Sequence, residues 1–142
     1  MAGLDLDQIM EEDRKALDAF VRGDPEPKKR LYSREDDVTL ANPLGPPARG
    51  WTEVAATLER AASLLRDGEV AACERISGYA TADLAYIVEI ERTRVRMAGA
   101  SELAPAALRV TTVFRREGDS WRIVHRHADP IAQQRAPESV LQ

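Results

Sequence analysis

The chain has 142 residues, which suits one domain built around one hydrophobic core rather than two. Hydrophobic residues make up 44% of it and charged residues 31%, and the net charge is −4, so the composition is that of an ordinary globular protein and argues against a nucleic-acid binder, where a clustered basic excess is expected. No apolar run approaches the roughly 20 residues of a membrane span, and the acidic N-terminus lacks the features of a signal peptide, so we expect no membrane partner.

The first half of the chain predicts helices. Apolar residues recur at helical spacing at residues 5–22 and 52–66. A short helix is expected between them at 25–32, where Asp24 is a natural N-cap and Pro25 fits the first turn. In the first stretch Asp5 or Asp7 can cap the start, and Gly23 suits the left-handed position past the end. Gly68 is expected to end the helix at 52–66.

The rest of the chain predicts strands, one of them between the second and third helices. A short strand at 38–41 comes first, and a Pro/Gly-rich loop at Leu44–Gly50 follows that cannot continue a strand or a helix. Long alternating runs then lie near 69–80, 84–97, 106–117 and 120–129. Helices followed by an antiparallel meander predict an α+β fold, with the helices on one face of a curved sheet. Such a sheet encloses a cone-shaped cavity, which suits a small ligand.

The last hairpin, Val110–Asp129, concentrates the groups with chemical potential. His125, His127 and Asp129 share one face of its second strand, about 6.5–7 Å apart per step, and can be considered as metal ligands. Arg126 lies on the opposite face. Which face points into the protein therefore decides which of these residues can serve a site.

Three stretches of the chain carry a resemblance to a known superfamily: FVRGD at 20–24, YSREDDVTLANPLGPPARG at 32–50, and residues 112–129. In these the chain resembles the nuclear transport factor 2-like superfamily, in particular its SnoaL-like and ketosteroid-isomerase-like branches. The end WRIVHRHAD is also similar to the association domain of calcium/calmodulin-dependent kinases. The resemblance implies three N-terminal helices packed on a cone-shaped half-barrel with an internal pocket. It implies a single domain over residues 1–132 and a loose tail over 133–142.

The resemblance to the isomerases does not extend to their catalytic residues. Their catalytic Asp corresponds to Asn42, and an amide cannot act as a general base. Their oxyanion Tyr corresponds to Ala16, and their protonated Asp donor corresponds to Thr112. Steroid-isomerase chemistry by that mechanism is therefore not expected.

The same resemblance assigns the faces of the last strand. Val124, Arg126 and Ala128 would face the cavity, whereas His125 and His127 would face a partner subunit, so we expect no metal there. A buried Arg126 must be paired or used. It would either clamp a carboxylate or phosphate of a ligand, or form an internal salt bridge to an acid such as Glu89 or Glu91.

Further pocket candidates come from two other elements. If Leu84, Tyr86 and the residues alternating with them face inward, Tyr86 offers a hydroxyl to the pocket and Arg92 sits near its mouth. Trp51 follows the Pro-rich loop and would act as a pocket lid or as a core residue.

The sequence predicts binding of a small, partly apolar molecule that is anionic or carbonyl-bearing. The ligand-binding candidates are Arg126, Tyr86, Thr112, Asn42, Trp51 and Arg92. Any chemistry would be cofactor-independent acid–base work of the isomerase, cyclase or dehydratase kind. The alternative is a non-catalytic assembly or interaction module like the kinase association domain. We expect a homodimer through the outer face of the sheet, and Cys73, a lone cysteine, indicates a cytoplasmic protein.

Overall fold

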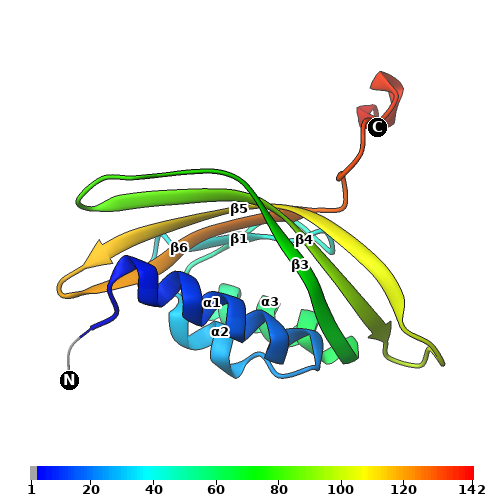
Figure 1. Cartoon of the computed structure of the whole chain (residues 1–142), viewed down its shortest axis with the longest axis horizontal. Helices are drawn as coiled ribbons and strands as arrows, with labels where there is room; N and C mark the ends of the chain where they lie inside the picture. Colours follow the sequence, from blue (N-terminus) through cyan, green and yellow to red (C-terminus); the bar gives the residue numbers. More distant parts are fainter. Residues whose placement is uncertain (1–2) are drawn as a thin grey trace.

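Three helices cover one face of a curved, open, six-stranded sheet in the computed structural model, which describes residues 3–142 (Figure 1). The helices are α1 (Leu6–Val21), α2 (Glu26–Leu31) and α3 (Trp51–Ser63). The strands are β1 (Thr39–Ala41), β2 (Ala48–Arg49), β3 (Leu65–Ala80), β4 (Leu84–Met97), β5 (Ala104–Glu117) and β6 (Ser120–Asp129). A short 3-10 helix, Pro137–Val140, lies in the C-terminal tail. No helix in the described part of the chain is long and apolar enough to cross a membrane.

Helix α1 begins where the sequence predicts. The Asp5 carboxylate accepts a hydrogen bond from the Gln8 amide at 2.8 Å, and the Gln8 side chain accepts one from the Asp5 amide at 2.8 Å. This reciprocal cap satisfies two of the amide groups that a helix leaves unpaired at its start. Gly23 has φ +99° just past the helix end, the left-handed conformation expected of it.

The sheet has the order β2-β1-β6-β5-β4-β3 and is not purely antiparallel as predicted. Strands β3 to β6 form the expected antiparallel meander, but β1 pairs in parallel with β6, so that Leu40 lies opposite Arg126. The loop after β1 also contains a strand that was not expected, since Ala48 of β2 pairs with Leu40. Both differences come from pairings between distant segments, which local sequence patterns do not encode.

Helix α3 ends at Ser63, and β3 starts two residues later at Leu65, so the prediction that Gly68 ends the helix was wrong. Gly68 instead lies within β3, pressed against the end of α1. A Cβ atom added there would stand 2.5 Å from the Val21 carbonyl oxygen and 2.7 Å from the Val21 Cβ. Only a glycine allows the backbones of α1 and β3 to approach this closely.

The face of β4 that points inward is not the one with Leu84 and Tyr86 that was considered for the pocket, but the opposite face. Ala85, Ile87, Glu89 and Glu91 are buried beneath the helices, each with 3–4% of its surface exposed. Tyr86 is 40% exposed on the outer face. The sequence was ambiguous because both alternating sets contain apolar residues, and the inner set also carries two carboxylates.

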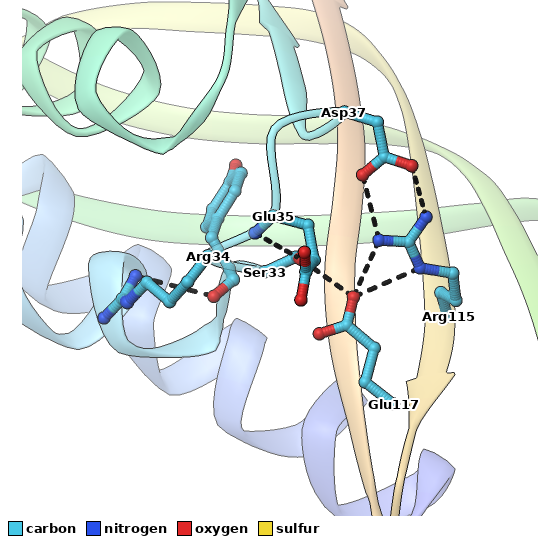
Figure 2. Close-up of polar contacts among 7 residues, drawn as sticks. Ser33, Arg34, Glu35, Asp37, Arg115 and Glu117 are labelled. Atoms are coloured by element: carbon cyan, nitrogen blue, oxygen red, sulfur yellow. Dashed lines mark hydrogen bonds and ion pairs between the residues drawn. The ribbon is translucent and has the colours of Figure 1, made fainter.

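The segment before β1 is fixed to β5 by a polar cluster (Figure 2). The buried Ser33 hydroxyl donates to Glu117 Oε2 at 2.8 Å and accepts from the Glu35 amide at 3.1 Å. Arg115 lies between Asp37 and Glu117, donating to both Asp37 oxygens at 2.7 and 3.0 Å. This cluster holds the chain that leads into β1 and thereby places the residue after β1, Asn42, at the cavity described next.

Candidate functional site

A cavity of about 210 Å³ lies between the inner face of the sheet and the helices α1 and α3. Its walls are almost entirely apolar, and the polar residues among those that line it are Asn42, Glu91, Thr93 and Arg126. The apolar walls come from Leu17, Phe20 and Val21 of α1, Leu58 and Ala61 of α3, Val95 and Met97 of β4, and Ala106 and Leu108 of β5, among others. The cavity occupies the end of the cone formed by the C-terminal half of β4, and Glu91 and Arg126 lie at its inner end.

A bidentate ion pair joins Arg126 to Glu91. The two terminal guanidinium nitrogens donate to the two carboxylate oxygens at 2.9 and 2.8 Å, and the two side chains are only 10% and 3% exposed. Burial by itself would raise the pKa of Glu91, but the charge and hydrogen bonds of Arg126 outweigh it and lower the pKa to about 2. The pKa of Arg126 is raised by the same contact, against the opposing effect of burial. Arg126 was expected either to bind an anionic group of a ligand or to form an internal salt bridge. The structure contains the internal salt bridge, with Glu91.

Asn42 also lines the cavity. Its side-chain oxygen accepts from the Leu44 amide at 2.9 Å, which identifies that atom as the carbonyl oxygen and leaves the amide nitrogen free to donate. Asn42 follows β1, whose Leu40 pairs with Arg126, so the two polar residues come from neighbouring strands. Each guanidinium has five N–H groups, and the hydrogen bonds found for Arg126 within residues 3–142 use two of its nitrogens.

Further polar groups are buried next to the cavity without lining it. Lys28 of α2 donates to Asp13 of α1 at 2.6 Å, and both side chains are at most 7% exposed. Burial, Glu91 and Asp13 together raise the pKa of Glu89, which favours its neutral form. Burial and the nearby carboxylates raise the pKa of Cys73 to about 11, so this thiol is not a reactive thiolate near neutral pH.

The structure brings two of the six predicted ligand-binding residues, Arg126 and Asn42, into the lining of the cavity. Thr112 is buried on the inner face of β5, beyond the cavity's inner end. Trp51 packs against the hydrophobic core, and the Arg34 guanidinium stacks on its ring at 3.5 Å.

The other two candidates, Tyr86 and Arg92, do not reach the cavity because their strand presents the opposite face inward. Arg92 is exposed and donates to Glu74 at 2.6 Å. The sequence indicated Glu91 only as a possible partner for Arg126, and its position in the cavity lining was not predicted. Its alternation with Ile87 and Val95 was the available signal.

The histidines of β6 lie on the outer side of the sheet, as the resemblance implied. His125 Nδ1 is 2.7 Å from the Thr39 hydroxyl oxygen of β1. His127 is exposed, and its Nε2 is 3.5 Å from Asp129 Oδ2. Within the described part of the chain, no group of three or more His, Cys, Asp or Glu side chains is arranged to hold a metal ion.

Comparisons with known proteins agree with this architecture. A family model described as the SnoaL-like domain matches residues 14–133. No curated protein matches the chain.

Solved structures of the same fold share little sequence with it. A nuclear transport factor 2-like superfamily protein from Salmonella enterica serovar Typhimurium is 18% identical, with a TM-score of 0.76, covering 93% of this chain and 94% of its own. A ketosteroid isomerase-like protein from Erwinia carotovora atroseptica is 21% identical, with a TM-score of 0.67, covering 88% and 95%. A protein from Thiobacillus denitrificans, assigned as a calcium/calmodulin-dependent protein kinase type II association domain, is 22% identical, with a TM-score of 0.71, covering 92% of this chain and 98% of its own.

At these identities the structures establish the fold alone, whereas the family model covers most of the sequence. The fold is that of the nuclear transport factor 2-like proteins, and the chain belongs to the SnoaL-like family.

Proposed function

We propose that the protein binds a small, mostly apolar, neutral molecule that carries a carbonyl group. The observation that carries this proposal is the cavity of about 210 Å³, whose apolar walls are interrupted by a charge-neutralised ion pair at the inner end and, after β1, by the Asn42 amide. Pockets that combine apolar walls with a few placed polar groups are the usual form of small-molecule sites.

The ion pair supports a neutral ligand over an anionic one. Arg126 could attract an anion, but Glu91 stays ionised at neutral pH and holds both ends of the guanidinium fork. An added carboxylate would meet the buried charge of Glu91 as well as that of Arg126. The remaining N–H groups of Arg126 and the Asn42 amide nitrogen are donors, and a ligand carbonyl oxygen is the acceptor they suit.

The proposed activity is binding rather than proton transfer. Glu91 has a pKa of about 2 and cannot serve as a general acid at neutral pH, and Asn42 does not titrate. If this is right, the protein will not accelerate exchange of the α-protons of a bound ketone. We expect the rate of deuterium uptake by cyclohexanone in D₂O, followed by NMR, to be the same with and without protein. A rate well above buffer would contradict the proposal and restore the isomerase-like alternative.

Two matched probes test the ligand class directly. Cyclohexanone and cyclohexanecarboxylate have the same ring and differ in the polar group, so their dissociation constants can be compared by ligand-observed NMR. We expect cyclohexanone to bind more tightly than the carboxylate. Equal or tighter binding of the carboxylate would reject the neutral-ligand proposal.

Asn42→Asp provides the matched variant. The aspartate keeps an oxygen for the Leu44 amide but loses the N–H donor and adds a negative charge to the cavity lining that already contains Glu91. We expect cyclohexanone affinity to fall about tenfold. An unchanged affinity would show that Asn42 does not contact the ligand.

We also propose that two copies associate through the outer face of the sheet. Large apolar side chains are exposed there and at the adjoining β3–β4 turn: Ile76, Tyr79, Leu84 and Tyr86. Such a concentration favours contact with another protein surface. Light scattering should give the mass of a dimer for the wild type and that of a monomer for Tyr86→Glu. A monomeric wild type would reject this second proposal.

A further inference from the structure

We propose that the ligand is elongated, and that its apolar tail leaves the cavity and lies in a groove between α3 and the loop at residues 42–47. The inference rests on the proposed function, because the carbonyl end of this ligand occupies the cavity already described. It adds a second binding region, in which Asn42 is the one residue that was a candidate from the sequence. It specifies the ligand class as a carbonyl compound that carries an alkyl chain.

The groove has a volume of about 570 Å³ and follows one side of α3. One wall is the loop, which contributes Leu44, Pro46 and Pro47, and the other is the helix, which contributes Ala56 near its middle. The polar residues of the lining are Asn42, Thr52, Glu53, Thr57 and Arg60. The space available is therefore larger than that of the cavity and is bounded by apolar side chains on both sides.

The cavity and the groove share part of their walls. Asn42, Leu44, Ala61 and Leu64 line both. Leu44 is 62% exposed and Leu64 is 39% exposed, and Met97, another residue of the cavity lining, is 45% exposed. Because these lining residues reach the surface, the cavity opens at this end. A ligand chain that leaves the cavity here passes over Leu44 and Leu64 into the groove.

The polar groups along the groove are already engaged with neighbouring protein groups. The Thr57 hydroxyl donates to the Glu53 backbone oxygen at 2.8 Å and accepts from Arg60 at 3.1 Å. The Glu53 carboxylate accepts from the Arg49 amide at 3.3 Å. Glu53 and Arg60 have opposite charges, so the lining carries no net charge. An uncharged alkyl chain suits this groove better than a charged group, which would leave one of them unfavourably placed.

The loop wall of the groove is held in a fixed shape. The Asn42 side chain accepts from the Leu44 amide at 2.9 Å, and β2 follows at once, where Ala48 pairs with β1. The rings of Pro46 and Pro47 fix the backbone between these two points. A groove that is already formed loses little conformational entropy when a ligand enters it, which favours binding.

The test compares 4-methylcyclohexanone with 4-pentylcyclohexanone, which share the ketone and differ by four methylene groups. Burying a methylene group completely raises affinity about fourfold, and a groove open on one side covers roughly half of it, so each should contribute about twofold. The wild type should therefore bind the pentyl compound about tenfold more tightly by ligand-observed NMR. Ala56 lies about 7.5 Å along the helix axis from Ala61, within reach of a chain that leaves the cavity at Ala61.

Ala56→Glu places a charged side chain in the groove and leaves the cavity lining intact, and glutamate is a good helix former. The ratio of the two affinities should fall toward 1, and the affinity for 4-methylcyclohexanone should not change. Ser63→Glu is the matched control, since Ser63 is exposed on the same helix and lines neither space. This control should keep the wild-type ratio. In the wild type, the backbone amides of Ala56 and Thr57 should shift with the pentyl compound and not with the methyl compound.

Two results would reject the groove and preserve the proposed function. The first is equal affinity of the wild type for the two ketones, with 4-methylcyclohexanone binding that still depends on Asn42. The second is a tenfold preference that Ala56→Glu leaves unchanged, or that shifts neither the Ala56 nor the Thr57 amide, because the chain would then lie elsewhere. If neither ketone binds, the proposed function itself is rejected, and the groove with it.

Discussion

Replacing Arg126 with methionine should strongly destabilise the protein and reverse the way in which its stability depends on pH. Methionine is similar in length and apolar, so it retains much of the packing and removes the charge. Glu91 would then be left as a buried carboxylate without its partner, with 3% of its side chain exposed. Breaking one partner of a buried pair typically costs about 3–5 kcal/mol.

The lowered pKa of Glu91 points in the same direction. A folded-state pKa of about 2, against an ordinary value of 4.5, corresponds to a stabilisation on the order of 3 kcal/mol. Because the folded pKa is lowered, this stabilisation is fully present above pH 4.5 and is lost as the pH falls toward 2. In Arg126→Met, burial alone remains and raises the pKa of Glu91. The variant should then be most stable below pH 4.5 and become less stable as the pH rises.

Urea denaturation between pH 3 and pH 8 measures both effects. Arg109→Met is the matched control, since Arg109 also pairs with a carboxylate, that of Asp129, but is 51% exposed on the outer face. The free energy of unfolding of Arg109→Met should lie within about 1 kcal/mol of the wild-type value. If Arg126→Met loses less than about 1 kcal/mol at pH 7, or keeps the wild-type pH dependence, the reasoning about the buried pair is refuted.

Three further predictions concern other parts of the fold. Glu89→Gln should remove one component of the pH dependence: because the pKa of Glu89 is raised, its own contribution to stability is greatest below pH 4.5 and is lost as the pH rises, so the variant should gain on the wild type from pH 4 to pH 8 in urea denaturation. Gly68→Ala should lower the free energy of unfolding by about 1–3 kcal/mol, since its methyl group would stand 2.5 Å from the Val21 carbonyl oxygen; a neutral result would mean that α1 can shift freely. Ser33→Ala should cost about 1–3 kcal/mol, because it leaves Glu117 and a backbone amide without their buried partner, and thermal melts that match the wild type would show that the cluster in Figure 2 adds little.

The sequence was sufficient for the fold because each long element carries its own periodic pattern. The meander of β3 to β6 follows from alternation and turn residues, and α1 follows from its apolar spacing and the Asp5 cap. The parallel pairing of β1 with β6 depends on contacts between distant residues, which such patterns do not report.

The candidate site was predicted only in part, for a physical reason that lies in β4. Carboxylates normally face solvent, so the buried set with Glu89 and Glu91 looked like an outer face, and Tyr86 was considered for the interior. Arg126 could be identified because its neighbours Val124 and Ala128 are apolar and the resemblance fixed the face of β6. The polar interior is the part of this protein that departs from ordinary sequence rules, which is where functional groups are expected.

The central claim, that the cone binds a neutral carbonyl compound, is tested most directly by mapping amide chemical shifts during a titration with cyclohexanone. The side-chain amide of Asn42 and the backbone amides of Leu108 and Ala128, which line the cavity, should shift together with one dissociation constant. Amides of Tyr86 and His127 on the outer face should not move. The account is contradicted if no amide shifts at saturating ketone, or if the shifts cluster on the outer face of the sheet.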